Sequence, residues 1–578
     1  MRTPIRCPES LVYGFTGSLL IALSACSYDA PDPAKATLKS PQPAADALQQ
    51  EIVAPALRKQ LSREPVQLSE YAASPASQAY ILPAPVESQA ALYATEDREQ
   101  YQHYPQNPVF AVAQAPVSTF SIDVDTGGYA NVRRLLNQGQ LPQPDAVRLE
   151  EMVNYFPYAY PQAKSDAPFA LSTEVAQTPW NAQSLLLRVA IKAEDRSVAE
   201  LAPANLVFLV DVSGSMDRRE GLPMVQSTLK LLVEQLRPQD RVSLVAYAGS
   251  SSVVLAPTSG SDKSTIRAAI DQLQAGGSTA GESGIELAYQ QAQKGFVKQG
   301  INRILLATDG DFNVGISDFD ALKQLAASKR KSGISLTTLG FGTGNYNERL
   351  MEQLADAGDG NYAYIDNLRE ARKVLVDQLG STLSVVAKDV KVQLEFNPAQ
   401  VSEYSLLGYE NRALAREDFS NDKVDAGEVG AGHSVTALYE IVPVGKQGWL
   451  EPLRYQSVTA KPAADQPSDE LAWIRLRYKA PEQNTSRLLE VPIAKPAQVA
   501  AIDKASEDLR FAAAVAAFAQ QLKGGQYTRQ FSLKDSAELA RGAKGDDRFG
   551  LRAEFIQLVE LAQSLQTSTH DLATNRVD

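Results

Sequence analysis

The sequence contains very little cysteine and histidine. Among its 578 residues there are two cysteines and three histidines. Both cysteines, Cys7 and Cys26, lie near the N-terminus, so the rest of the chain has no thiol for a disulfide, a metal site or nucleophilic catalysis. His433 lies in a glycine-rich stretch without an accompanying nucleophile motif, and we interpret it as a turn residue. We therefore predict no catalytic residue.

The sequence also lacks a dense cluster of lysine and arginine. With a net charge of −12, it has no basic patch of the kind that binds phosphate groups, which argues against a nucleic-acid partner. Its hydrophobic content of 44% and charged content of 21% are ordinary for globular proteins, so most of the chain should fold. The length exceeds that of one compact domain, and roughly two to four units are expected.

The N-terminal apolar run, Leu11–Leu23, is too short and too often interrupted by small polar residues to be a good membrane span. It follows two arginines and ends in Leu23-Ser24-Ala25-Cys26, which resembles a bacterial lipobox. The resemblance implies that residues 1–25 are a signal peptide and that Cys26 becomes the acylated N-terminus. The alternative is an ordinary signal peptide with an incidental cysteine.

A lipidated Cys26 would anchor the protein in a membrane of the bacterial cell envelope. Each buried acyl methylene contributes about 0.8 kcal/mol, so several chains hold firmly where one would not. Serine rather than aspartate at position 27, directly after the cysteine, resembles the pattern of outer-membrane lipoproteins, and the inner membrane is the alternative. Residues 26–107 are rich in alanine, proline, glutamine and serine, which predicts a disordered tether. Residues 108–168 should form an N-terminal segment of mixed α/β structure.

Residues 205–387 alternate apolar runs with helical patterns, which is typical of a parallel, doubly wound α/β sheet. The run 206–210 is apolar throughout, as in a strand buried on both faces. The runs 241–248 and 252–255 are close enough to pair as a hairpin. The pattern ends in a single predicted helix over 368–383.

The segments on either side of the α/β region have the pattern of strands. Residues 169–204 and 388–495 contain alternating apolar runs, and we predict that together they build one β-sandwich with the α/β domain inserted in it. Residues 496–578 read as a C-terminal helical region. Phe511, Val515 and Phe518 share one helical face there, which indicates core packing.

Oxygen-bearing side chains follow three of the predicted strands or turns. Asp211, Ser213 and Ser215 come directly after the first buried strand, Thr279 lies in a glycine-rich turn, and Asp309 closes another strand. Ligands in open α/β sheets bind outside the carboxyl ends of the strands, so these loops should converge at one edge. Hydroxyl and carboxylate oxygens suit a hard divalent cation such as Mg²⁺. Taken singly, a serine or aspartate after a strand more often caps the next helix.

The Asp-x-Ser-x-Ser motif at Asp211, with Thr279 and Asp309, resembles the complete metal-ion-dependent adhesion site of the von Willebrand factor type A (VWA) family. The regions flanking residues 205–387 look like a bacterial lipoprotein subgroup of that family. The resemblance implies Mg²⁺, with Mn²⁺ or Ca²⁺ as alternatives, and a partner protein that supplies a Glu or Asp carboxylate. The chain would then be a binding or scaffold protein and not an enzyme.

Two other interpretations remain open at this stage. A metal-assisted hydrolase of envelope polymers would need a second metal cluster or a general base at motif spacing, and neither appears in the sequence. The other interpretation is a regulatory role, because in integrin-like relatives the metal site is coupled to the last helix of the domain. The stretch Gly340–Gly344 faintly resembles a phosphate loop but lacks its register and lysine, so we interpret it as a turn.

Overall fold

The computed structural model describes residues 99–122, 124–163, 167–279, 281–310, 319–451, 453–454 and 469–574. The predicted signal peptide, Cys26 and the first part of the predicted tether lie outside the described residues. Within the part that is described, no helix is both long enough and apolar enough to cross a membrane.

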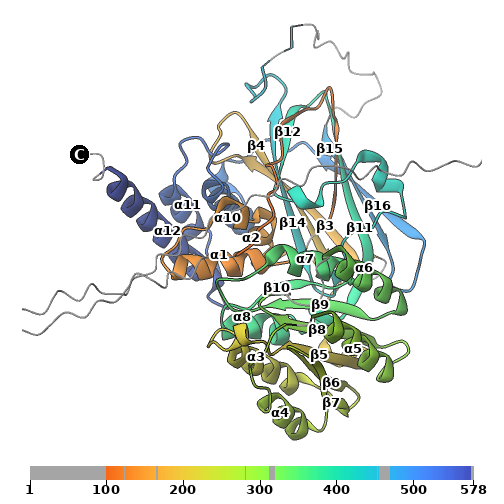
Figure 1. Cartoon of the computed structure of the whole chain (residues 1–578). Helices are drawn as coiled ribbons and strands as arrows, with labels where there is room; N and C mark the ends of the chain where they lie inside the picture. Colours follow the sequence, from red (N-terminus) through yellow and green to blue (C-terminus); the bar gives the residue numbers. More distant parts are fainter. Residues whose placement is uncertain are drawn as a thin grey trace, which may run out of the picture. The chain divides into compact units, whose positions relative to one another are not determined.

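A six-stranded sheet forms the centre of the predicted α/β region (Figure 1). Its strands lie in the order β10-β9-β8-β5-β6-β7, and all neighbours are parallel except β6 and β7. The bounds are β5 Ala204–Asp211, β6 Arg241–Tyr247, β7 Ser251–Ser259, β8 Ile301–Thr308, β9 Ser335–Gly340 and β10 Tyr362–Tyr364. Every residue of β5 is buried, as its apolar sequence predicts for a central strand. The doubly wound sheet and its terminal hairpin are confirmed.

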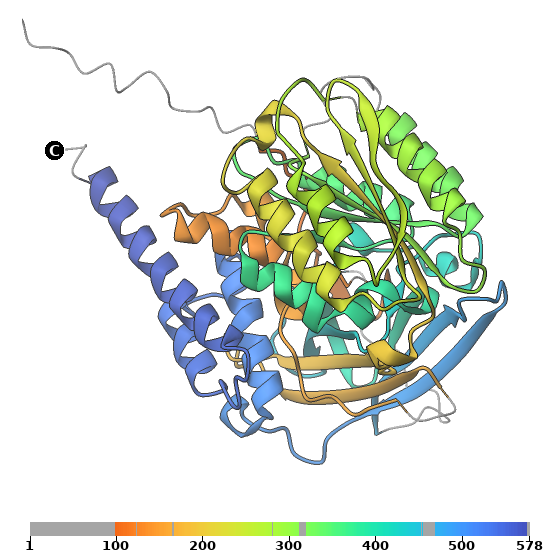
Figure 2. The ribbon, with the colours of Figure 1, turned by 90° about the horizontal axis from the view of Figure 1, so that it is seen from below.

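Helices cover both faces of this sheet (Figures 1 and 2). One face packs against α3 Leu222–Gln235 and α4 Lys263–Asp271. The opposite face packs against α5 Gly281–Lys294, α6 Phe319–Lys329 and α7 Glu348–Ala357. Each face has its own buried apolar core, so the sheet is held on both sides as in other doubly wound folds.

The last helix of the α/β region differs from the sequence-based expectation. The prediction of one helix over 368–383 is wrong, because the segment divides into α8 Leu368–Arg372, a π-helical turn Lys373–Asp377 and α9 Leu379–Leu383. Gln378 leaves helical geometry at φ −109°. The segment after it, α9, contains Gly380, Ser381 and Thr382, which are poorer helix formers than alanine or leucine and favour such an interruption.

Two antiparallel sheets form the sandwich. One has the order β1-β12-β14-β4-β3, and the other has the order β13-β11-β15-β16 with β2 also paired to β11. The bounds are β1 Phe110–Ala111, β2 Val117–Ser121, β3 Phe169–Gln177, β4 Leu185–Ala193, β11 Val385–Phe396, β12 Val401–Leu407, β13 Val429–Gly430, β14 Ser434–Pro443, β15 Glu470–Lys479 and β16 Ser486–Ala494. β4 precedes the α/β domain and pairs with β14, which follows it. The inserted arrangement is therefore present, and both sheets share one core.

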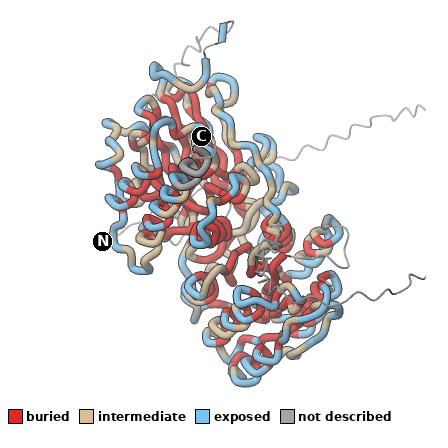
Figure 3. Tube along the Cα trace, turned by 60° about the vertical axis from the view of Figure 1, so that its left-hand side comes forward, coloured by how far each residue is buried: buried red, intermediate tan, exposed pale blue. Residues whose placement is uncertain are grey.

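Helices from the two ends of the described chain share a third core. It contains residues of α1 Gly127–Asn137 and α2 Leu149–Asn154 together with α10 Glu507–Leu522, α11 Leu533–Arg541 and α12 Leu551–Thr574. In Figure 3 the buried segments lie mostly inside the fold and the exposed ones on its outside. Phe511, Val515 and Phe518 of α10 are all at most 1% exposed. The core interpretation of these three residues is confirmed. Segments expected to be separate units, 108–168 and 496–578, thus pack together.

The described chain begins inside the segment that we expected to be tether. Glu99 has a side chain that is 3% exposed and forms an ion pair with Arg134. Gln100 pairs with Asn347 as an isolated parallel bridge. Folded packing therefore starts at least eight residues before the expected tether end at 107, because the Glu99 carboxylate finds a buried partner in Arg134 that composition alone does not reveal.

Candidate functional site

The predicted metal-site residues lie at the carboxyl edge of the six-stranded sheet. Asp211 is the last residue of β5, and Asp309 directly follows β8, the strand beside it. The loop after β5 is tied to the glycine-rich turn by two backbone hydrogen bonds, from Gly214 N to Gly277 O (3.0 Å) and from Gly276 N to Val212 O (2.8 Å). These bonds bring the serine loop beside the turn that carries Thr279.

The Asp211 carboxylate is buried and accepts hydrogen bonds from three donors. Its side chain is fully buried, and its Oδ1 accepts a bond from Ser213 N at 2.9 Å. Its Oδ2 accepts bonds from Thr308 Oγ1 at 2.8 Å and from Tyr247 OH at 3.3 Å. The sequence interpretation did not include Thr308 or Tyr247. Each is the last residue of a strand that neighbours β5. Their positions at the ends of predicted strands were the one feature of the sequence that could have indicated them.

The two serines of the motif present their hydroxyls together. Ser213 Oγ lies 3.1 Å from Ser215 Oγ. Two adjacent oxygens of an octahedral Mg²⁺ site, each about 2.1 Å from the ion, lie about 3.0 Å apart. Ser213 is 2% exposed, whereas Ser215 is half-buried and the intervening Gly214 is exposed. The hydroxyl pair therefore fits an octahedral ion that faces the outside of the molecule.

Asp309 supplies the second carboxylate of the site. It is 1% exposed, and its Oδ2 accepts a hydrogen bond from Asn345 Nδ2 at 3.0 Å. Burial, together with the nearby charge of Asp309, raises the pKa of Asp211 to about 6 against the hydrogen bonds that lower it. A cation between the two carboxylates would remove this electrostatic cost. Thr279 is also buried, at 6% exposure.

The donor set defines which ion the edge could hold. It comprises hydroxyl and carboxylate oxygens, which are the ligands of hard divalent cations. No group of three or more His, Cys, Asp or Glu side chains with metal-binding geometry occurs among the described residues. A site built here therefore depends on hydroxyls as much as on charge.

The other two candidate features have structural roles in the fold. Gly340 ends β9, and the following turn places Gly342 and Gly344 at φ values of +75° and +84°, which glycine adopts readily. His433 lies in the β13–β14 turn, where its N–H donates to Gly430 O at 3.2 Å. Both interpretations as turn residues are confirmed.

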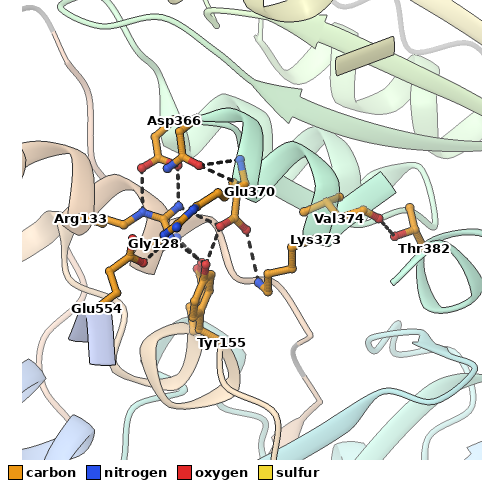
Figure 4. Close-up of polar contacts among 12 residues, drawn as sticks. Gly128, Arg133, Tyr155, Asp366, Glu370, Lys373, Val374, Thr382 and Glu554 are labelled. Atoms are coloured by element: carbon orange, nitrogen blue, oxygen red, sulfur yellow. Dashed lines mark hydrogen bonds and ion pairs between the residues drawn. The ribbon is translucent and has the colours of Figure 1, made fainter. Parts of the chain in front are cut away.

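A buried ion network lies at the start of the last helix, and no sequence motif indicated it (Figure 4). The guanidinium of Arg133 in α1 binds Asp366, Glu370 and Glu554, from the segment before α8, from α8 and from α12. Tyr155 OH and Lys373 Nζ also contact the Glu370 carboxylate. The network joins the α/β domain to the shared helical core.

Comparison with known families supports the division of the chain that the fold reveals. The model of the von Willebrand factor type A domain matches residues 205–378. A model described as von Willebrand factor matches residues 95–188, and one described as the C-terminal part of the uncharacterized protein YfbK matches residues 381–565. The α/β domain is therefore a VWA domain.

Individual proteins extend the comparison. The uncharacterized protein sll0103 of Synechocystis sp. is 33% identical over 34% of this chain and 45% of its own length. The solved von Willebrand factor type A protein of Catenulispora acidiphila is 16% identical, with a TM-score of 0.37, over 68% of this chain and 91% of that one. The uncharacterized protein YfbK of Escherichia coli is 50% identical over 88% of this chain and 89% of its own length. At that identity and coverage, the chain belongs to the YfbK family.

Proposed function

We propose that this protein is a binding or scaffold protein of the bacterial cell envelope, anchored to the outer membrane through lipid on Cys26. Its VWA domain binds a divalent cation, Mg²⁺ in the first place, through Asp211, Ser213, Ser215, Thr279 and Asp309. With that cation it takes up a Glu or Asp carboxylate of a partner protein. The VWA fold itself supports a role in protein interaction.

One observation carries the metal part of the proposal. The serine loop, the glycine-rich turn and Asp309 meet at one edge of the sheet, with two serine hydroxyls 3.1 Å apart and a buried Asp211 beside them. Asp211 is held by Ser213 N and Thr308 Oγ1, so its carboxylate cannot rotate freely. The donors are thus arranged before a cation arrives, which lowers the cost of binding.

The accessibility of the edge supports an external ligand. Gly214 and Ser278 are exposed, and Ser215 is half-buried, whereas the carboxylates behind them are closed off from water. A bound cation would supply an electrophilic position that attracts a carboxylate. The chain's own side chains fix the site, and the exposed glycine leaves room for the partner to approach.

Binding is favoured over catalysis by where the histidine side chains lie. Among the described side chains, His103 contacts Asp145 at 2.8 Å and His433 lies in a sandwich turn. Neither lies at the carboxyl edge of the six-stranded sheet, where a general base would have to act. Turnover of a peptidoglycan or phosphoester substrate that disappears in Ser213→Ala would instead support a metal-assisted hydrolase.

The proposal is tested by capture of partner proteins with the full-length lipoprotein in detergent. We expect capture to depend on Mg²⁺, to be lost with a chelator and to be lost in Asp211→Ala. Ser227→Ala is the matched control, since it removes an exposed hydroxyl of α3 that donates a hydrogen bond to Pro223 O within the same helix. Capture that is insensitive to both the chelator and Asp211→Ala would overturn the proposal.

A further inference from the structure

Residues 342–347 of the loop between β9 and α7 pack against the carboxyl edge of the six-stranded sheet, where the candidate metal site lies. Asn345 Nδ2 donates a hydrogen bond to Asp309 Oδ2 at 3.0 Å. The backbone of the same loop also lies close to the turn at Asp309. A Cβ on Gly310 would come within 2.9 Å of Asn347 N, and one on Gly342 would come within 3.3 Å of Asp309 Cβ. Any displacement of this loop would therefore move the Asp309 carboxylate.

The opposite side of the same loop contacts the first described residues of the chain. Glu99 Oε1 accepts a hydrogen bond from Gly344 N at 2.9 Å, next to Asn345. Gln100 N donates to Tyr346 O at 2.9 Å, and Gln100 pairs with Asn347 in a parallel bridge. The segment 99–101 thus lies along the loop that contacts Asp309 and is joined to it by an isolated β-bridge and a side-chain hydrogen bond.

The second carboxylate oxygen of Glu99 also accepts hydrogen bonds. Its Oε2 accepts bonds from Arg134 Nη2 and Tyr101 OH, both at 2.6 Å, and Asn131 Nδ2 donates to Tyr101 OH at 2.8 Å. Burial raises the pKa of Glu99, but the charge of Arg134 and these hydrogen bonds outweigh it and lower the pKa. Glu99 is therefore a buried carboxylate that joins helix α1 to the loop beside Asp309.

We propose that the segment Glu99–Tyr101 is a latch on the metal site, with Glu99 and Asn345 as positioning residues. Docking of the segment on the β9–α7 loop orients the Asp309 carboxylate and so raises affinity for the cation. This inference rests on the proposed metal site. Because the segment lies within the predicted tether, docking or release of this part of the tether would regulate metal binding.

Coupling between the latch and the site must be reciprocal. If a docked segment strengthens metal binding, a bound metal must strengthen docking by the same factor. Groups that orient a metal ligand through a hydrogen bond typically change metal affinity by about 10–100-fold when they are removed. We expect a loss in that range for Asn345→Ala, and a smaller loss of about 3–10-fold for Glu99→Ala, which acts one step further away.

The test is titration of the full-length protein in detergent with Mn²⁺, followed by electron paramagnetic resonance. Asn345→Ala and Glu99→Ala should weaken Mn²⁺ binding, and Glu99→Gln should recover part of the loss because it keeps an acceptor for Gly344 N. Gln102→Ala is the matched control. It directly follows the segment Glu99–Tyr101, and its side-chain oxygen accepts a hydrogen bond from Gln353 in α7, away from the loop beside Asp309. Its affinity should remain within about twofold of wild type.

A second readout separates positioning from general stability. Hydrogen–deuterium exchange of the loop 342–347 and of segment 99–101 should slow when Mn²⁺ is added to the wild type, and should not respond in Asp211→Ala. Equal Mn²⁺ affinity in wild type, Glu99→Ala and Asn345→Ala would overturn the latch while leaving the metal site standing. If the wild type binds no Mn²⁺, the proposed function itself fails.

Discussion

Arg133 and Asp366 form a buried ion pair, with Arg133 Nη2 2.5 Å from Asp366 Oδ1 and both side chains at most 5% exposed (Figure 4). Arg133 belongs to α1, and Asp366 lies just before the last helix of the VWA domain. The pair ties that helix to a part of the chain far away in sequence. In this fold the helix start is therefore fixed from outside the VWA domain.

Removing one partner of this network should be costly. Arg133→Met would leave Asp366 and Glu370 buried without their shared cation, and we expect the free energy of unfolding to fall by about 3–5 kcal/mol. Urea denaturation followed by circular dichroism measures the change. The control is Arg475→Met, since Arg475 and Glu490 form a partly exposed pair that should contribute less than about 1 kcal/mol. Similar losses in the free energy of unfolding for both variants would contradict the claim that burial makes the Arg133 network costly to break.

Acid should destabilise the protein through His433. Burial, with the charges of Lys192 and Lys373, lowers the pKa of His433 to about 4, and its Nδ1 has no hydrogen-bond partner among the described residues. The unfolded chain takes up this proton near pH 6.5, whereas the folded protein takes it up only near pH 4. The contribution of neutral His433 to the free energy of unfolding is therefore full above pH 6.5 and is lost as the pH falls toward 4.

The size of this pH effect is measurable. We expect a loss of about 2–3 kcal/mol between pH 6.5 and pH 4 in the wild type. His433→Asn removes the titrating group, and its stability should fall less over the same range. His433 lines a surface pocket together with Asp195 and Asp377, and these two carboxylates are unchanged in the variant. Parallel curves for wild type and variant would show that His433 does not cause the loss.

The shared helical core should depend on Phe555. Its ring lies 5.6 Å from that of Phe156 and 5.4 Å from that of Phe511, measured between centroids, and it is fully buried. Phe555→Ala should lower the free energy of unfolding by about 3–5 kcal/mol, because it leaves a cavity between α10, α12 and the segment that follows α2. Phe549 is 52% exposed, and Phe549→Ala should have an effect below about 0.5 kcal/mol.

Membrane attachment should depend on Cys26. In Cys26→Ser we expect loss of labelling by radioactive palmitate and release from the outer-membrane fraction, since the acyl chains provide most of the membrane affinity. Fractionation of cells that express each form measures this. Ser27→Asp should keep the label but move the protein toward the inner membrane. Unchanged fractionation of Cys26→Ser would rule out the lipid anchor.

The sequence pattern predicted the doubly wound α/β sheet well because its signals are local and repeated, whereas the VWA family was indicated by the resemblance of one motif. The uninterrupted apolar run of β5 and the alternation of strands with helices both follow from simple burial rules. The pairing of β4 with β14 could also be expected, because strands on each side of an inserted domain need partners. The interruption of the last helix could not be predicted, because its π-helical turn depends on packing around Lys373, which the local sequence pattern does not indicate.

The same distinction holds for the candidate site. Asp211, Ser213 and Asp309 were predicted because their spacing after strands is visible in the chain, and the structure places them at one edge. The residues that hold them, such as Asn345, were missed. Asn345 reaches Asp309 from a loop after another strand, and only the folded topology brings the two together. Long-range polar contacts of this kind leave no periodic signal.

Calorimetric titration of the full-length protein with Mg²⁺, beside Ser213→Ala, tests the central claim most directly. The variant removes one of the two hydroxyls that lie 3.1 Å apart and leaves both carboxylates in place. We predict one Mg²⁺ per wild-type chain and at least a tenfold weaker affinity in the variant. Wild-type protein that binds no Mg²⁺, or a variant that binds it equally well, would contradict the account.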